Sequence, residues 1–576
     1  MGERIDPEPS PSHPNSTAKE DVESIASIDE PAPVLTTELD DYPKTNHATL
    51  ENGTRYEFLT FETPIPLDES RGIPLPNLRQ YDSPFGWSAP RKNIVLIISC
   101  WCTFTAAYSA GAYSIASEPQ RQKWGVSSVA FGVGVTMWAL GFACSPMFLA
   151  PFSEINGRRP VFIGSAVMFL VGQIGCAATN SFAAMLVFRF IVGAGASTFA
   201  TMVGGVVSDM YHAEHRNTPM AIYSGSALAG TGFGPLLSGF IVGRASYRWV
   251  YYHQIISLGL LFVTVCVFFK ETRGSVLLSR KAKAVNEYLE KAEQITQQRD
   301  DDDDDGHRNT QSDEKPAPGS TPVPRTRLRY KVAADENRSS LAHMLYLSLT
   351  LPFKLLATEP VVFFFSLWAS FAWAVLYMTF SVLPLIFRTR HNFTTEQNGA
   401  VFAAISIGSI LATILSIAQE RIAKRHWPKL TESPEGRLYF ACLEAALLPI
   451  GLFWFGWTTS SSIPWIVPIL AIGCAQIGIF VIYLAVFNYL ADVYHAYASS
   501  ALAAQSFMRN LMAAIFPLFT DQMFRNIGYP QASSLLGGIS ALLTLVPWVL
   551  LFNGEKIRAR SRIARQIMAQ GQGQGG

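Results

Sequence analysis

The chain has 576 residues, of which 49% are hydrophobic and only 15% are charged. Soluble domains carry about 25% charged residues, so this composition predicts a membrane protein. A formal net charge of +1 excludes a strong electrostatic attraction to nucleic acid. The seven cysteines all lie in apolar segments without histidine partners, so we expect no metal, no disulfide framework and no cofactor.

The first 90 residues are rich in Pro, Ser, Thr, Asp and Glu. Such a segment buries too little apolar surface to offset the entropy that it would lose on ordering. We therefore predict a disordered cytoplasmic tail over residues 1–90. Trp87 near its end is an interfacial anchor, and Arg91 and Lys92 follow as cytoplasmic charges.

Apolar runs of membrane-spanning length follow in two groups. A span needs about 20 apolar residues to cross ~30 Å of hydrocarbon, where helices satisfy their own backbone groups. The pattern predicts an all-α membrane protein with two six-helix bundles, at residues 91–270 and 346–553. The twelve expected helices are 93–116, 129–149, 160–179, 182–208, 218–242, 249–269, 360–386, 397–418, 436–457, 463–490, 498–519 and 533–552.

A short charged turn at residues 150–162, APFSEINGRRPVF, indicates the orientation. Arg158 and Arg159 place the turn in the cytoplasm by the positive-inside bias, although several arginines in the expected external loops weaken that bias. An even number of helices then returns the basic tail at 554–576 to the cytoplasm. The same orientation places Asn392, in an Asn-Phe-Thr sequon, outside the cell as a candidate for glycosylation.

A hydrophilic stretch at residues 271–345 separates the two bundles. Leu278, Val285 and Leu289 recur at helical spacing with basic residues between them. This pattern predicts an amphipathic helix on the inner leaflet or on the cytoplasmic face of the protein. An acidic run and a proline-rich segment follow, which we interpret as a solvated linker.

The charged turn has two interpretations. Gly157 permits a tight backbone, and Glu154 can cap or pair with a nearby helix end. Arg158 and Arg159 can then clamp the neighbouring half of the protein or lipid phosphates. An ordinary basic cytoplasmic loop explains the same residues equally well.

Arg189 lies well inside an otherwise apolar helix. A charge there costs about 3 kcal/mol or more, and such residues usually face a polar cavity or a counter-charge. Partial snorkelling towards the outer surface is the alternative. We favour a functional role for Arg189.

The fifth predicted helix carries small residues at four-residue intervals. They are Ser226, Gly230, Gly234 and Ser238, with Pro235 and Gly239 beside them. Such a ridge lets another helix approach closely, and the proline bends the helix. General close packing explains the same pattern.

These segments resemble the major facilitator superfamily, in particular its fungal drug:proton antiporters. The turn resembles that family's loop signature, Arg189 with Gly193 its fourth-helix motif, and residues 230–240 its fifth-helix export motif. Further matches are Arg248 with Trp249, residues 270–282, 488–494 and 500–510, and residues 553–561, so the resemblance runs from about residue 82 to 561. Three positions depart from the motifs, Ala150, Ile155 and Ser238.

The resemblance implies alternating access of two six-helix bundles around a central cavity. It gives Arg189 a role in proton coupling and associates Gly230, Gly234, Pro235 and Gly239 with export. It also implies that Glu154, Gly157, Arg158 and Arg159 latch the two halves together.

Several other polar or aromatic residues are candidates. Glu444 lies about two turns into the ninth helix, where a buried carboxyl could carry a proton, although a snorkelled carboxyl also fits. The residues that could line the cavity are Tyr108, Tyr113, Trp373, Tyr377, Gln476, Tyr483, Asn488, Arg509 and Asn510. For single aromatic residues, packing against lipid is the default alternative.

We therefore predict a monomeric, proton-coupled exporter of hydrophobic drugs or a secondary metabolite, and not an enzyme. Its partners would be protons, a small amphiphilic organic substrate and the lipid bilayer, most plausibly of the plasma membrane. No phosphate-binding loop of the ATP-hydrolysing type is found in the sequence. The alternatives are uptake or exchange of a defined solute, such as a polyamine or an organic acid, and, more remotely, a membrane sensor or a polytopic enzyme.

Overall fold

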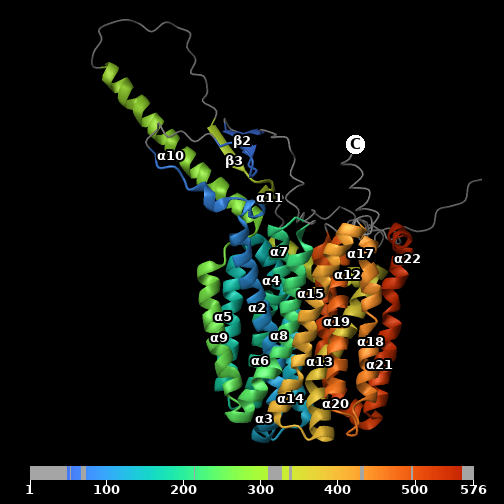
Figure 1. Ribbon diagram of the computed structural model, residues 1–576. Helices are drawn as coiled ribbons and strands as arrows, with labels where there is room; N and C mark the ends of the chain where they lie inside the picture. The colour runs from blue at the N-terminus through green and yellow to red at the C-terminus, as the bar shows by residue number, and fades with distance from the viewer. Residues whose placement is uncertain are drawn as a thin grey trace, which may run out of the picture.

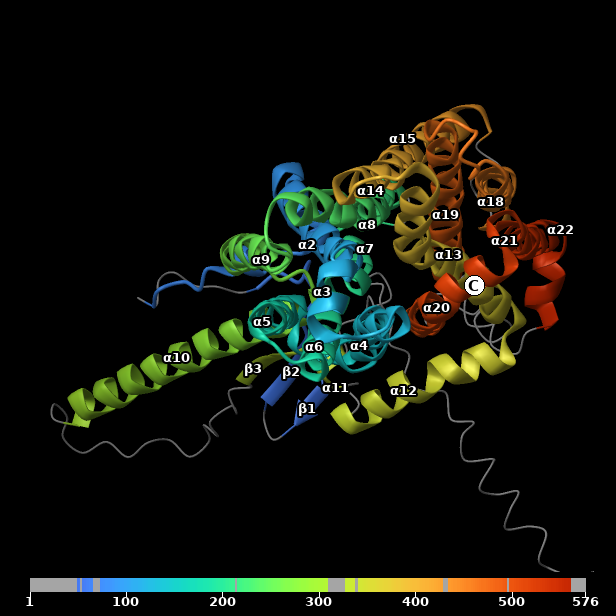
Figure 2. The same ribbon diagram turned by 90° about the horizontal axis from the view of Figure 1, so that it is seen from below.

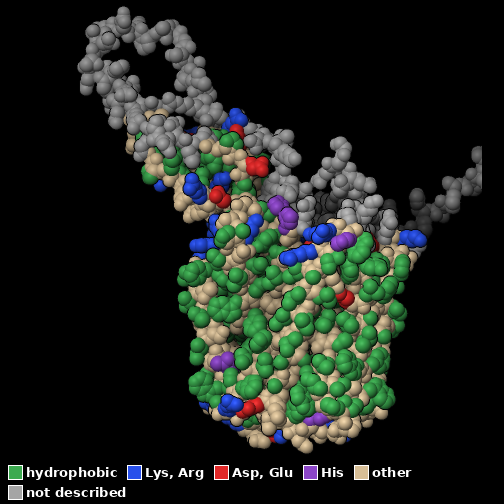
Figure 3. All heavy atoms as spheres, viewed as in Figure 1, with side chains coloured by type: hydrophobic (Ala, Val, Ile, Leu, Met, Phe, Trp, Pro, Cys, Tyr) green, Lys and Arg blue, Asp and Glu red, His purple; other side chains and the backbone are tan. Residues whose placement is uncertain are grey.

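The computed structural model describes residues 49–51, 54–65, 73–212, 215–308, 327–336, 340–427, 434–494 and 497–560. Long helices run side by side in one bundle, and one helix with a small sheet stands at one end of it (Figure 1). We call this the α10 end, after α10 (Gly274–Arg308), and the opposite end the α3 end, after α3 (Ser117–Trp124). Hydrophobic side chains cover the visible side of the bundle, and most charged side chains lie towards its two ends (Figure 3).

The bundle has two halves, which lie beside each other when viewed along the helices (Figure 2). The N-half contains α2 (Ala89–Ile115), α4 (Ser128–Asn156), α5 (Arg158–Ala178), α6 (Phe182–Thr201) continued by α7 (Val203–Met210), α8 (Asn217–Arg244) and α9 (Trp249–Phe268). The C-half contains α13 (Pro360–His391), α14 (Thr395–Val401) continued by α15 (Ala403–His426), α17 (Pro434–Glu444) continued by α18 (Leu447–Trp457), α19 (Ile466–Tyr494), α20 (Ala498–Ile527), and α21 (Tyr529–Leu543) continued by α22 (Leu545–Arg560).

The predicted membrane architecture is confirmed. Among the described residues, eleven helical spans are long and apolar enough to cross a membrane. α20 is the twelfth helix of the bundle, and its polar residues, among them Arg509, Asn510 and Asp521, make it less apolar than the others. The halves meet where α8 packs against α14 and α15 and where α4 packs against α20.

One further helix, α12 (Leu341–Thr358), lies at the α10 end and was not predicted from the sequence. It contacts α4 of the N-half and α20 of the C-half. The Ser348 hydroxyl donates to the carbonyl oxygen of Met147 at 2.8 Å. α12 therefore touches both halves before the chain enters the C-half.

Part of the predicted disordered tail is ordered, which corrects the expectation for residues 1–90. β1 (Thr49–Glu51) pairs antiparallel with β2 (Thr54–Phe58), and β2 pairs parallel with β3 (Arg327–Lys331), a strand from the linker between the halves. The short helices η3 (Leu78–Tyr81) and η4 (Pro84–Gly86) then lead into α2. Residues 1–48, 309–326 and 561–576 lie outside the described residues.

The order of this segment has a tertiary cause. Leu59 is buried together with Leu278 and Val285 of α10 and with Tyr330 and Val332 of the linker. The tail alone lacks enough apolar surface to fold, and the linker supplies it. The apolar face of α10 therefore packs on this sheet, so of its two predicted positions the structure shows contact with the protein itself and not with the inner leaflet.

Charged residues outside the membrane-spanning segments support the same contact. Arg329 of β3 donates to both carboxylate oxygens of Glu293 on α10, at 2.7 and 2.8 Å. This carboxylate raises the pKa of Arg329 above its usual value. Burial lowers the pKa of Lys281, whose Nζ lies 3.4 Å from the carbonyl oxygen of Phe61.

Candidate functional site

Arg189 of α6 is enclosed inside the N-half, with 1% of its surface exposed. Its Nε donates to the carbonyl oxygen of Gly134 at 3.1 Å, and its Nη1 donates to that of Ser109 at 3.3 Å. The guanidinium lies over the ring of Tyr113, 4.4 Å from the centroid. Arg189 therefore faces the interior of the protein, and the alternative of partial snorkelling is wrong.

Small residues on the neighbouring helices make room for this arrangement. Gly193, one turn after Arg189, lies directly against the carbonyl oxygen of Trp138 on α4. A Cβ on Gly134 would meet the hydroxyl group of Tyr113. α6 can approach α4 this closely because Gly193 lacks a side chain, and Gly134 likewise leaves room on α4 for the ring of Tyr113 from α2.

Arg509 of α20 is the second buried guanidinium, with 4% of its surface exposed. Its Cζ lies 4.4 Å from the ring centroid of Trp373 on α13 and 4.8 Å from that of Tyr483 on α19. Its Nη2 reaches the Ser506 hydroxyl at 3.5 Å, whereas Nε and Nη1 have no hydrogen-bond partner among the described residues. Most of its hydrogen-bonding capacity is therefore unused.

Aromatic side chains lie between Arg189 in the N-half and Arg509 in the C-half. The rings of Trp138 on α4 and Tyr377 on α13 lie 6.3 Å apart, and Tyr377 lies within electrostatic range of both guanidinium groups. The hydroxyl oxygens of Tyr223 on α8 and Tyr483 on α19 are 3.4 Å apart. We call this set the central cluster; its members are Tyr113, Trp138, Arg189, Tyr223, Trp373, Tyr377, Tyr483 and Arg509.

Sequence reasoning missed Trp138 and Tyr223. Tyr223 lies three residues before Ser226, the first member of the small-residue ridge on α8. That spacing places Tyr223 on a neighbouring turn of the same helical face and is the only sequence signal that we find for it. Nothing in the sequence distinguishes Trp138 from an aromatic residue that faces lipid.

Among the described residues, the helices of the central cluster carry no carboxylate in their middle turns. α2, α6, α8 and α13 contain no Asp or Glu at all. Asp521 lies about 18 Å along α20 from Arg509, and Asp492 about 14 Å along α19 from Tyr483. The buried guanidinium groups of Arg189 and Arg509 therefore lie in the central cluster without a carboxylate nearby among the described residues of these helices.

Four predicted cavity residues lie outside the central cluster. The Tyr108 hydroxyl pairs with Nε2 of His253 at 2.6 Å, between α2 and α9. The Gln476 amide donates to the Ser409 hydroxyl at 3.0 Å, and the Asn510 amide donates to the carbonyl oxygen of its own helix at Ser506, at 2.7 Å. The Asn488 amide donates to Asn217, the first residue of α8, at 2.9 Å.

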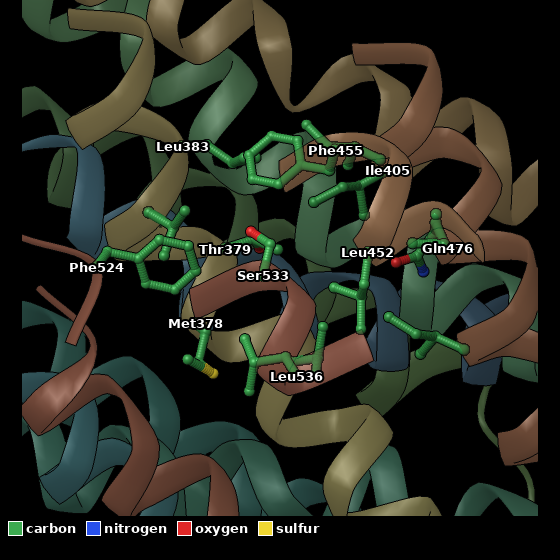
Figure 4. A pocket seen from close by; sticks show the side chains of 16 residues that line it. Met378, Thr379, Leu383, Ile405, Leu452, Phe455, Gln476, Phe524, Ser533 and Leu536 are labelled. Carbon is green, nitrogen blue, oxygen red and sulfur yellow. The ribbon is translucent and has the colours of Figure 1, made fainter. Parts of the chain in front are cut away.

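Two pockets lie inside or beside the C-half. One, with a volume of about 50 Å³, is apolar and contains Met378, Thr379 and Leu383 of α13, with Gln476 as a polar wall (Figure 4). The other, of about 120 Å³, lies at the α10 end, and Asn488, Glu420 and Glu444 are among the residues that line it. Of the predicted cavity residues outside the central cluster, Gln476 lines the first pocket and Asn488 the second, whereas Tyr108 and Asn510 line neither.

The charged turn at residues 150–162 forms its ion pairs and hydrogen bonds with the N-half and with the first residues of the linker. Arg158 donates through Nε to Asp209 of α7 at 3.2 Å, and Asp209 also pairs with Arg273 at 3.5 Å. The carboxylate of Glu271 accepts the backbone N–H groups of Arg158 and Arg159 at 2.8 and 3.2 Å. These contacts lie within the N-half and its linker, so in this structure neither arginine clamps the C-half.

The other turn residues explain its shape. Gly157 has φ of +98°, a conformation that favours glycine, and it lies against the Glu271 carboxylate. The Arg159 guanidinium donates to the carbonyl oxygen of Cys266 at 2.8 Å. Glu154 is partly exposed at the end of α4. Asp209, Glu271 and Arg273 complete this charge network, and sequence reasoning did not identify them.

The small residues of α8 serve two different contacts. A Cβ on Gly230 would lie 2.5 Å from the carbonyl oxygen of Phe104 on α2, and Gly234 lies against the next turn of the same helix. A Cβ on Gly239 would lie 2.7 Å from Cα of Gly399 on α14, in the other half. Pro235 lies against Gly111 of α2. One helix therefore packs within its half through one set of glycines and against the C-half through another.

Residues 99–517 of this chain match the sequence model of the Major Facilitator Superfamily. The chain belongs to this superfamily. It is 30% identical to a protein named efflux pump FUBT of Fusarium oxysporum, over 82% of this chain and 74% of that protein. It is 34% identical to efflux pump atB of Aspergillus terreus, over 73% of this chain and 82% of atB. It is 29% identical to the citrinin biosynthesis cluster MFS transporter mrr1 of Monascus ruber, over 84% and 90%.

Solved structures of the superfamily show the same fold. The proton:xylose symporter XylE matches with a TM-score of 0.56 and 14% identity, over 81% of this chain and 97% of XylE. A partially occluded, inward-open structure of XylE from E. coli matches with a TM-score of 0.53 and 15% identity, over 79% and 98%. This protein is therefore a multi-pass membrane protein built from two bundles of the major facilitator type.

In major facilitator proteins, transport depends on movement of one half against the other, so contacts between the halves act as gates. At the α3 end, Arg244 pairs with Glu396 at 3.1 Å, and Arg388 pairs with Glu118 at 3.3 Å. At the α10 end, Asn488 donates to Asn217 at 2.9 Å, and Thr218 donates to Glu420 at 3.3 Å. Polar contacts thus connect the halves at both ends in this conformation.

Glu444, the second candidate for proton coupling, lies in the C-half. It is half-buried and accepts a hydrogen bond from the Gln419 amide. Arg189 contacts Gly134, Ser109 and Tyr113, all in the N-half, so the structure does not bring the two candidates together. Any coupling between them has to pass through the contacts of the two halves.

Asn392, the candidate glycosylation site, ends α13 at the α3 end. It is exposed and has φ of 56°. The Thr394 hydroxyl of the sequon accepts the backbone N–H of Gln397 and caps α14. The side chain of Asn392 is therefore accessible, at the end of the bundle that faces away from α10.

Proposed function

We propose that this chain exports small amphiphilic organic molecules, such as drugs or secondary metabolites, by alternating access of its two halves. Inward proton flow drives the cycle. The names of its relatives, efflux pumps and a transporter of a biosynthetic gene cluster, support the direction and the substrate class. The protein acts in the plasma membrane, with the α10 end and both chain termini in the cytoplasm and Asn392 outside.

The central cluster is the observation that carries this proposal. It contains side chains of α2, α4, α6 and α8 from the N-half and of α13, α19 and α20 from the C-half. A molecule bound among these side chains contacts both halves at once, so movement of the halves changes its contacts. Aromatic surfaces with a few polar groups suit amphiphilic organic molecules.

The two candidates for proton coupling have different roles in this proposal. An arginine keeps its proton in proteins, so Arg189 acts as a fixed positive charge that positions the N-half helices. Glu444 is the carboxyl that gains and loses the proton. Its hydrogen bond with Gln419, on the neighbouring α15, makes the contact sensitive to protonation.

Efflux from cells tests the proposal. A yeast strain without its own efflux pumps would express the protein and be preloaded with rhodamine 6G, 2-naphthoate or 2-naphthamide. We expect faster loss of at least one probe than in cells without the protein, and a protonophore should abolish the difference.

Variants at Arg189 and Glu444 extend this test. Arg189→Gln and Glu444→Gln should slow export about tenfold or more at unchanged surface expression, because the first removes a fixed charge with its hydrogen bonds and the second removes the group that carries the proton. Arg525→Gln, an exposed position on α20, is the matched control. Net uptake of the probes, or efflux whose rate is unchanged by the protonophore, would contradict the proposal.

A further inference from the structure

We infer that Arg509 is the binding group for the carboxylate of an organic acid with a flat aromatic body, and that such acids are the preferred substrates. This inference rests on the proposed function, because it names the substrate class for the same central cluster. It assigns substrate recognition to the C-half, through a residue that sequence analysis predicted only as one of several residues lining the cavity.

The first step is the state of the Arg509 guanidinium. The rings of Trp373 and Tyr483 lie near it at 4.4 and 4.8 Å, and the residue is 4% exposed. Such rings attract a cation but accept none of its N–H groups in conventional hydrogen bonds. Nε and Nη1 lack a partner among the described residues, and Nη2 has only Ser506 at 3.5 Å. Buried donors without partners are costly, so this site is built for an acceptor that arrives with a ligand.

The second step separates Arg509 from Arg189. Arg189 already donates to two backbone carbonyls, of Gly134 and Ser109, and only its Nη2 is unpaired. These bonds fix Arg189 to α4 and α2. Within the described part of the chain, Arg509 donates to no backbone carbonyl, so it is the guanidinium that can turn its donors towards a ligand.

The third step is the sign of the ligand charge. Among the described residues, the middle turns of the surrounding helices supply no carboxylate, and Asp521 is about 18 Å along α20 from Arg509. The indole N–H of Trp138 is a further buried donor without a partner. A cluster with two positive charges and unpaired donors repels cations and favours an anion with acceptor oxygens.

The fourth step is the shape of the ligand. Trp138, Trp373, Tyr377 and Tyr483 supply ring surfaces around the guanidinium groups. Met378 and Thr379, next to Tyr377, line the apolar pocket of the C-half (Figure 4). A flat aromatic body can stack on such rings, and its carboxylate then reaches Arg509.

Binding to the purified full-length protein in lipid nanodiscs tests this inference without requiring transport. The probes are 2-naphthoate and 2-naphthamide, which share the aromatic body but differ in charge, and the readout is quenching of tryptophan fluorescence at pH 7. We expect wild-type protein to bind the naphthoate about ten- to hundredfold more tightly than the amide, as a hydrogen-bonded charge pair provides. Equal affinities would overturn the inference, because the free donors of Arg509 would then be satisfied by water.

Variants identify the residue. Arg509→Gln should lower naphthoate affinity to that of the amide and leave amide binding unchanged, whereas Arg509→Lys should keep part of the preference. Arg525→Gln on the same helix is the control, and a thermal melt of each variant checks that it is folded. A folded Arg509→Gln protein that still prefers the naphthoate would also overturn the inference.

Transport of the two probes distinguishes this inference from the proposed function. Export of neutral 2-naphthamide as fast as 2-naphthoate would remove the carboxylate preference and leave proton-driven export standing. Selective binding of the naphthoate without export would have the opposite meaning: the anion site would stand and the exporter would fall.

Discussion

Arg189 and Arg509 show how two arginines of similar burial take different roles. Arg189 is bonded to the carbonyl oxygens of Gly134 and Ser109 and stacks on Tyr113. Arg509 lies near two rings and keeps two nitrogens without a hydrogen-bond partner in the described part of the chain. The first arginine fastens three helices of the N-half together, and the second retains donors for a ligand.

The geometry of Arg189 predicts that lysine cannot replace it. A lysine ammonium is a compact group and cannot reach both carbonyls while it stacks on Tyr113. We expect Arg189→Lys to reduce the free energy of unfolding by about 2 kcal/mol, the value of one charge-assisted hydrogen bond. Differential scanning fluorimetry in detergent measures this as a lower Tm. Arg525→Lys, at an exposed position, should leave Tm unchanged, and equal Tm values for both variants would show that Arg189 is not held in this way.

At the scale of elements, α8 takes part both in packing within the N-half and in packing between the two halves. Gly230 and Gly234 face α2 of the same half, and Gly239 faces Gly399 of the C-half. A residue added on the first face disturbs the fold of the N-half, whereas one added on the second face disturbs the contact between the halves. The two effects can be separated by experiment.

We expect Gly234→Ala to lower stability by about 1–3 kcal/mol, because its Cβ would meet the backbone of Tyr108, which cannot move independently. Gly239→Ala should lower Tm much less and slow efflux more, because it keeps the halves apart at the α3 end. Gly164→Ala and Gly259→Ala are matched controls, since no atom lies within 4 Å of a Cβ at either position. Similar losses of Tm in all four variants would contradict this division of roles.

At the scale of the whole molecule, the two halves are connected at both ends. The ion pairs Arg244–Glu396 and Arg388–Glu118 cross between the halves at the α3 end. Their arginine side chains are 74% and 63% exposed, so solvent screens both pairs and each is weak. We therefore expect these pairs to influence the balance between open and closed forms at that end, with little effect on folding.

Removing both pairs should therefore shift this balance. We expect the double variant Arg244→Gln with Arg388→Gln to raise the ratio of open to closed forms at the α3 end up to about tenfold. Spin labels at Asn180 and Ser460, one in the N-half and one in the C-half, report the distance between the halves by pulsed electron resonance. A longer component should grow at high salt and in the variant alike, since salt screens exposed ion pairs; the same distance distribution in wild type and variant would exclude a gating role for these pairs.

The sequence determined the number and position of the membrane-spanning helices, but not α12, because length and apolar composition are local properties that the bilayer requires directly. It also placed Arg189, Arg509 and the glycines of α8 inside spans. Only the tertiary structure decided which residues meet: Tyr223 with Tyr483, Gly239 with Gly399, and Arg158 with Asp209. The order of residues 54–59 was likewise decided by β3 and α10, since a strand is stable only when distant parts of the chain supply its hydrogen bonds and its apolar partner.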